Sequence, residues 1–152
     1  MRTKAVQDAN QWDSRLDIVN THKFKKLLNQ YGWPKLSLFS VEVCRSAWLL
    51  AQHADEDIKF QKQCLSMMKS LPQKEVLLWT TAMLEDRILV SEGKEQIFGS
   101  QFHKDSKTGM LVPWPIANPE ELDLRRAKVG LNAFADELQI IQKFAKAKPA
   151  RP

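Results

Sequence analysis

Cysteine, glycine and long apolar runs are all scarce in this 152-residue chain. Its two cysteines, Cys44 and Cys64, are too few for a disulfide framework, and both stand among apolar residues, where we expect small buried hydrophobes. The five glycines form neither a phosphate-binding loop nor a dinucleotide-binding fingerprint. The most apolar run, near residues 76–90, contains charged side chains and falls short of the roughly 20 residues that span a bilayer, so we expect no membrane contact.

Motifs of the familiar enzyme classes are also missing. There is no GxSxG elbow, no HExxH and no kinase signature set. His53 stands close to Asp55 and Asp57, but the sequence lacks the further well-spaced His or Cys that a zinc centre needs. We therefore expect no metal and no cofactor.

The net charge of +5 is concentrated at one end of the chain. Glu137 is the last acidic residue, and the positive charges that follow it are Lys143, Lys146, Lys148 and Arg151. Residues 1–137 alone carry a net charge of +1. Because the excess lies in a short tail and not on a basic face with interleaved aromatic side chains, we do not expect nucleic-acid binding.

Length and composition favour one folded domain. The chain is 43% hydrophobic and 27% charged, which is enough to bury a core and to stay soluble. We expect a single helical domain over residues 1–147 and a flexible basic tail over residues 148–152. The N-terminal segment has no apolar stretch of the kind found in secretory signals, so we expect a cytoplasmic protein, provided that Met1 is the native start.

Hydrophobic spacing predicts a mainly α fold. Asn20 or Thr21, Ser40, Asp55 and Asn118 are the expected N-caps of four helices. The segment after Ser40 is apolar nearly all the way around, so we expect a central, buried helix there. The predicted helices span residues 4–16, 21–31, 41–51, 56–69, 74–92, 119–129 and 131–147.

The helical period disappears between residues 93 and 118. Two short apolar stretches, IFGSQF and MLVPW, flank the turn-rich KDSKTG. This pattern predicts one small β-hairpin or an extended flap around residues 95–115. In the same stretch, Gly99 permits an unusual backbone angle or the close approach of a ligand, and the nearby Gln96, Ser100 and Gln101 offer donors and acceptors.

Two polar residues do not fit a plain helical core. Asp86 shares a helical stripe with Trp79, Met83 and Val90, so its carboxylate needs either a cation or several hydrogen-bond donors. His53 closes the apolar helix 41–51, where the helix dipole and nearby carboxylates favour an imidazole. A capping histidine that ties two helices together and a functional histidine are both compatible with this position.

Taken in order, the fragments GWP, QHAD, DR, GSQF and PWPI resemble an uncharacterised bacterial family of small proteins that carries only a domain-of-unknown-function label. The resemblance covers residues 8–140. It implies recurring polar positions, which match Gln52, His53, Asp55, Asp86, Arg87, Gln96, Gln101 and Arg126. This chain has Phe98 where the family more typically has Tyr, and Ser100 where it has Thr. The resemblance brings no established activity.

Three functions are compatible with these residues. The first is a binding module whose pocket is lined by His53, Asp86, Arg87 and Gln101 and recognises a small polar or anionic ligand, or a segment of a protein partner. The expected ligand-binding residues are Gln52, Arg87, Gln96, Gln101 and Arg126. The second is a metal-independent hydrolase or transferase, with His53 as general base and Asp55 or Asp86 orienting it. The third is a regulatory or immunity-type protein that acts through its outer surface while these residues only hold the helices together.

Overall fold

The computed structural model describes residues 14–147, with the side chains of residues 17–143. The fold is mainly α with one small antiparallel hairpin, as the sequence predicts. The tail at 148–152 and most of the predicted helix at 4–16 lie outside the described residues. Residues 14–16 belong to the first helix that the structure describes.

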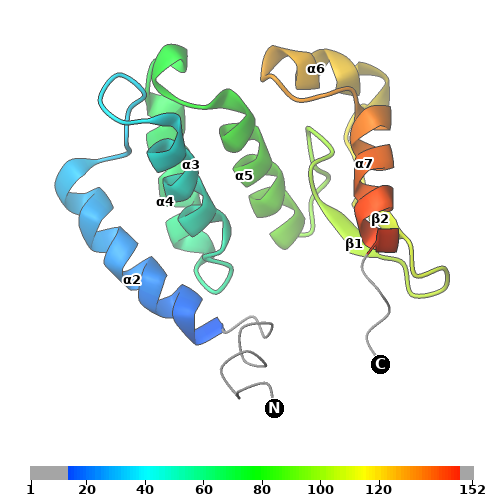
Figure 1. Ribbon diagram of the computed structural model, residues 1–152, viewed down its shortest axis with the longest axis horizontal. Helices are drawn as coiled ribbons and strands as arrows, with labels where there is room; N and C mark the ends of the chain where they lie inside the picture. Colours follow the sequence, from blue (N-terminus) through cyan, green and yellow to red (C-terminus); the bar gives the residue numbers. More distant parts are fainter. Residues whose placement is uncertain (1–13, 148–152) are drawn as a thin grey trace.

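Four helices build the larger part of the molecule: α2 (Ser14–Tyr31), α3 (Val41–Gln52), α4 (Ile58–Ser70) and α5 (Leu78–Ser91). Helix α5 packs against both α3 and α4, and α2 packs against α3. Aromatic and apolar side chains fill the space between them, including Phe24, Trp48, Phe60, Met68 and Leu84. Figure 1 shows α5 between this group of helices and the C-terminal elements.

The C-terminal elements pack on the other side of α5 (Figure 1). Strands β1 (Phe102–Lys104) and β2 (Leu111–Pro113) pair with His103 opposite Val112, which confirms the predicted hairpin. The short 3-10 helix η2 (Pro119–Glu121) leads into α6 (Leu122–Lys128), and α7 (Phe134–Ala147) then packs against β2 and α6.

Two predicted helix starts are wrong, because the capping side chains have other roles. Helix α2 runs continuously through Thr21, which is buried in its interior. The carboxylate of Asp57, and not that of Asp55, accepts the hydrogen bond from the backbone N–H of Phe60 at the start of α4. Ser40 does cap α3, through the backbone N–H of Val43.

The other helix boundaries also differ from the pattern. A 3-10 turn, η1 (Gln73–Glu75), replaces the first turn of the predicted helix 74–92, so α5 begins at Leu78. Asn118 adopts a left-handed backbone with φ of 43°, and its side chain makes no capping bond. Its carbonyl accepts a hydrogen bond from Arg125 instead. The helix after it therefore begins with η2.

Both cysteines are buried, as expected. Burial raises the pKa of the Cys64 thiol to about 12, so this group stays protonated and packs as a small hydrophobe. Among the described residues, no helix combines the length and apolarity that crossing a bilayer requires.

Candidate functional site

The carboxylate of Asp86 is fully buried on α5 and accepts hydrogen bonds from the loop that precedes the hairpin. Backbone N–H groups of Ile97, Phe98 and Ser100 donate to it at 2.7, 3.0 and 2.9 Å, and the Ser100 hydroxyl donates at 2.9 Å. The several donors that the sequence requires are therefore present, and most are backbone amides. Such charge-assisted bonds fix the position of the loop on α5.

Gln96 closes the same loop from inside. Its amide Nε2 donates to the carbonyls of Gln101 and Trp114 at 3.0 and 2.9 Å, and its Oε1 accepts from the backbone N–H of Gln101 at 2.9 Å. The side chain is completely buried. Gln96 therefore holds the loop against the strand that follows the hairpin turn.

Arg126 connects this loop to the C-terminal helices. Its buried guanidinium donates to the carbonyls of Phe98 and Asn132, both at 2.6 Å, and lies 3.7 Å from the carboxylate of Glu137. Burial lowers the pKa of Arg126, and the charge of Glu137 opposes this effect. All these contacts of the guanidinium are made with groups of the protein itself.

Asp55, Arg87 and Gln101 form a second polar chain nearer the surface. The guanidinium of Arg87 binds the carboxylate of Asp55 through two nitrogens, one of them at 2.7 Å, and reaches Gln101 Oε1 at 3.4 Å. Burial would raise the pKa of Asp55, but the hydrogen bond and the charge of Arg87 outweigh it and lower this pKa. The chain links the turn after α3 to α5 and to the hairpin.

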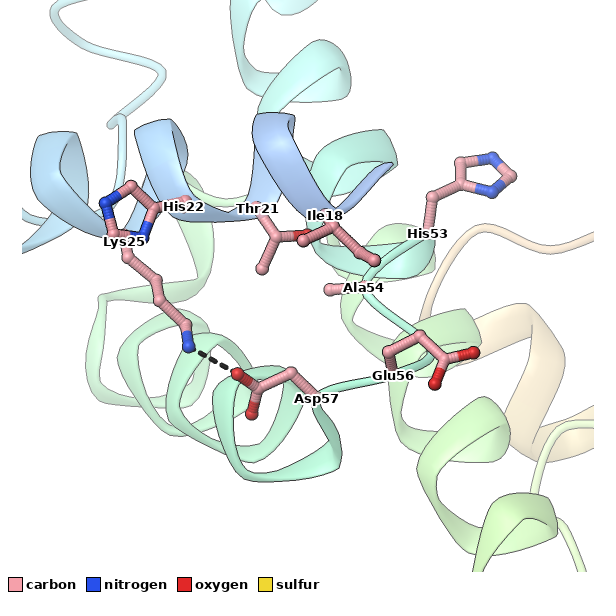
Figure 2. A pocket seen from close by; sticks show the side chains of 8 residues that line it. All are labelled: Ile18, Thr21, His22, Lys25, His53, Ala54, Glu56 and Asp57. Atoms are coloured by element: carbon pink, nitrogen blue, oxygen red, sulfur yellow. Dashed lines mark hydrogen bonds and ion pairs between the residues drawn. The ribbon is translucent and has the colours of Figure 1, made fainter. Parts of the chain in front are cut away.

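His53 lies at the wall of a separate pocket of about 290 Å³, between α2 and the turn that joins α3 to α4. Figure 2 shows His22 and Lys25 at one end, His53 and Glu56 at the other, and the side chains of Ile18, Thr21 and Ala54 between them. The ammonium group of Lys25 donates to the carboxylate of Asp57. The charge of His53 also acts on the nearby Asp55 and helps to lower its pKa.

The predicted site residues therefore lie in different parts of the molecule. Asp86, Gln96 and Arg126 converge on the loop at residues 96–101, while Asp55 and Arg87 meet Gln101 at its edge. Gln52 is buried in α3, and its Oε1 has no hydrogen-bond partner in the described part of the chain. His53 and the buried Asp86 do not share a cavity wall. A catalytic or ligand-binding role for these eight residues stays a prediction.

The pattern of the sequence did not indicate an apolar groove between α2 and α3, which we call the α2–α3 groove. Its volume is about 490 Å³, and the large side chains on its walls include Leu27, Tyr31, Leu38, Phe39, Val43 and Leu50. The expectation that helix 41–51 is buried all around is wrong, since Val41, Val43 and Leu49 are exposed. The available signal was a helix that is apolar on every face. A domain this small has few elements with which to cover all sides of such a helix.

No group of three or more His, Cys, Asp or Glu side chains within residues 17–143 is arranged to hold a metal ion. The geometry therefore gives three features: a buried polar cluster around the loop, the polar pocket at His53, and the α2–α3 groove.

Comparison with known proteins identifies a family for this chain but no function. No curated protein and no solved structure matches it. A model of a family of unknown function, DUF6624, matches residues 8–148. This match covers nearly the whole sequence and includes the helices, the hairpin and the groove described above. The chain therefore belongs to the DUF6624 family of proteins of unknown function.

Proposed function

We propose that this protein is an interaction module that binds an amphipathic helical segment of a protein partner in the α2–α3 groove. One observation carries the proposal: large apolar side chains on the groove walls are exposed to water. The exposed fractions of Leu27, Tyr31, Leu38 and Phe39 are 54, 72, 72 and 48%. A contiguous exposed apolar patch of this kind marks interaction surfaces in soluble proteins.

The shape of the groove suits a helix. Phe24, Leu27, Leu28 and Tyr31 follow one side of α2, and Val43, Ala47 and Leu50 follow one side of α3. The two helices thus supply two walls of the groove, and Pro34, Leu38 and Phe39 from the segment that connects them also line it. The stretch of α2 from Phe24 to Tyr31 rises about 10 Å, which matches roughly two turns of a partner helix. Recognition would follow the helix-in-groove mode, with apolar anchors at helical spacing.

The bonding of the acidic residues supports binding over catalysis. In the catalytic alternative, Asp55 or Asp86 would orient the imidazole of His53. The hydrogen bonds of Asp55 go to Arg87 and Gln61, and those of Asp86 go to the loop at residues 97–100. Both carboxylates are thus committed to holding helices and loop together.

A labelled helical peptide of about 14 residues, with leucine along one face and glutamine on the other, tests the proposal. We expect it to bind the protein in fluorescence anisotropy. The double variant Leu27→Asn with Leu38→Ser should weaken this binding about tenfold or more, because buried apolar anchors at helix-in-groove interfaces each contribute more than about 1 kcal/mol. Both residues are exposed, so the variant should remain folded.

Leu124→Asn is the matched control, since Leu124 on α6 is 67% exposed and lies outside the groove. It should bind the peptide as the unchanged protein does. Failure of the peptide to bind at millimolar concentration, or equal weakening by Leu124→Asn, would contradict the proposal.

The pocket at His53 supports a second candidate function, the binding of a small polar ligand. Its volume of about 290 Å³ is at the lower end for ligand pockets, and its lining includes His22 and His53 at opposite ends, Ile18 and Ala54 between them, and the carboxylates of Glu56 and Asp57 (Figure 2). We expect some small carboxylates or phosphates in a thermal-shift screen to raise the Tm, and His53→Ala with His22→Ala to remove this rise. If the same compounds stabilise the double variant equally, they bind elsewhere and this candidate fails.

A further inference from the structure

We propose that the partner in the α2–α3 groove is a second copy of this chain, and that the two copies pack their α2 and α3 helices face to face. The inference rests on the proposed function, since it names the occupant of the same groove. A symmetric pair of this kind buries the same surface on both copies. Two antiparallel helix pairs that meet through apolar faces form a four-helix bundle.

Both helices turn apolar side chains toward the groove at the spacing of bundle helices. Helices in a bundle meet through apolar residues three or four positions apart. The chain reverses direction between α2 and α3, which pack against each other (Figure 1). The side chains that face the groove are Phe24, Leu27, Leu28 and Tyr31 on α2 and Val43, Ala47 and Leu50 on α3. The helix pair therefore has the form of half a four-helix bundle.

A second copy already carries the helical segment that the groove requires. Leu27 and Tyr31 lie one turn apart on α2 and are 54 and 72% exposed. The stretch of α2 that carries them is about two turns long, which is the length that the groove accommodates. Helix α2 of one copy would place these side chains against the groove of the other, and the two-fold symmetry would repeat the contact. No further chain is needed to supply the apolar anchors.

The described residues that line the groove carry no charged side chain. Only Tyr31 and Ser46 among them have a side-chain hydroxyl, and the others are apolar. A charge on this face would be stripped of water in a symmetric pair, which is costly without an opposite charge beside it. Cores of protein interfaces are accordingly depleted of charged residues. The groove is therefore a face that pairs with its own copy without burying an ion.

The exposed apolar surface is large enough for a reversible dimer. Five large side chains on the groove walls are between 46 and 72% exposed; they are Leu27, Tyr31, Leu38, Phe39 and Val43. With about 100 to 200 Å² of surface for each, they present on the order of 500 Å² per copy. Pairing two copies would bury on the order of 1,000 Å², near the lower limit of specific interfaces. We therefore expect a dimer that dissociates on dilution.

Sedimentation equilibrium of the full chain, from about 1 μM to about 1 mM, tests the inference. We expect the mean mass to rise from that of one chain to that of two and to stop there, because a face-to-face pair leaves no groove open. An excess of the leucine-faced peptide should return the protein to the monomer, since the peptide and the second copy need the same groove.

Val43→Glu separates the interface from the fold. Val43 is 46% exposed on the groove wall, and its backbone N–H donates to the hydroxyl of Ser40 at the start of α3. A glutamate there would complete a capping box with Ser40, so the helix should keep its stability in a thermal melt. Each copy would then bring a carboxylate to the apolar interface, and the dissociation constant of the dimer should rise about tenfold or more.

Val41→Glu is the matched control. It adds the same charge to the same helix at a residue that is 52% exposed and does not line the groove. This variant should dimerise as the unchanged chain does.

Each other outcome overturns the inference. A chain that stays monomeric at the highest concentration but binds the leucine-faced peptide would remove the second copy and leave the groove proposal standing. A monomer that binds no peptide would remove both. Equal weakening of the dimer by Val43→Glu and Val41→Glu, or assembly beyond two chains, would place the self-association on another surface.

Discussion

Asp86→Asn is expected to lower the free energy of unfolding by about 3 kcal/mol. The carboxylate accepts from three backbone N–H groups and one hydroxyl in a fully buried position. An asparagine of the same shape keeps one oxygen and turns an NH₂ group toward donors, so at least one backbone N–H loses its acceptor. Buried donors without partners are costly because no water replaces the lost bond. Urea denaturation at neutral pH measures the change.

The loop should respond locally as well as globally. Amide hydrogen exchange at Ile97, Phe98 and Ser100 should accelerate in the Asp86→Asn variant, because these are the N–H groups that lose their charged acceptor. Glu85→Gln is the control: Glu85 is adjacent in sequence and pairs at the surface with Lys69 at 2.6 Å. Its replacement should change stability by less than about 1 kcal/mol. Similar losses in both variants would mean that Asp86 does not anchor the loop.

Gly99→Ala is expected to destabilise the protein by about 2 to 3 kcal/mol, for two reasons that add. Gly99 has φ of +65°, a backbone conformation that disfavours any residue with a Cβ by about 1 kcal/mol or more. A Cβ built there would also lie 2.9 Å from Phe134 Cε2 and 3.2 Å from Ile116 Cδ1. Overpacking of this kind typically costs 1–3 kcal/mol, because the side chains of Phe134 and Ile116 must move away from the new Cβ. Urea denaturation again measures the change.

Gly130→Ala separates the two contributions. Gly130 has φ of +77° and no atom within 4 Å of the Cβ position, so only the backbone effect of about 1 kcal/mol remains. Gly99→Ala should therefore be the more harmful of the two. Equal losses would show that the contact with Phe134 relaxes freely and that Gly99 is needed for its backbone angle alone.

Several local features could be predicted because short-range chemistry sets them. The Ser40 cap, the hairpin between Phe102 and Pro113 and the buried cysteines follow from spacing and turn composition. The need of Asp86 for several donors also followed, since a carboxylate on an apolar stripe admits few alternatives. At Gly99 the sequence left open an unusual backbone angle or the close approach of a ligand; the backbone is left-handed, and the close neighbour is the side chain of Phe134.

Other features could not be predicted, because they depend on which elements meet. Asp55 and Asp57 are equally good helix caps by sequence, and the position of Arg87 on α5 takes Asp55 out of that role. Arg87 and Arg126 both looked available for a ligand, but each is bonded to protein groups far along the chain. In the sequence, His53 and Asp86 both stand among apolar residues. Only the packing of α2 and of the loop at residues 96–101 places them at different sites.

By itself, the sequence determined a mainly helical domain with a small hairpin, membership of a family of unknown function, and the polar residues that need partners. These features follow from the hydrophobic periodicity and from the free energy of burying a charge. Both depend on residues within a few helical turns of each other. Tertiary structure alone decided where the partners are and which apolar side chains stay exposed. The groove between α2 and α3 stays open because no other element within residues 14–147 covers it, and that depends on how these elements pack.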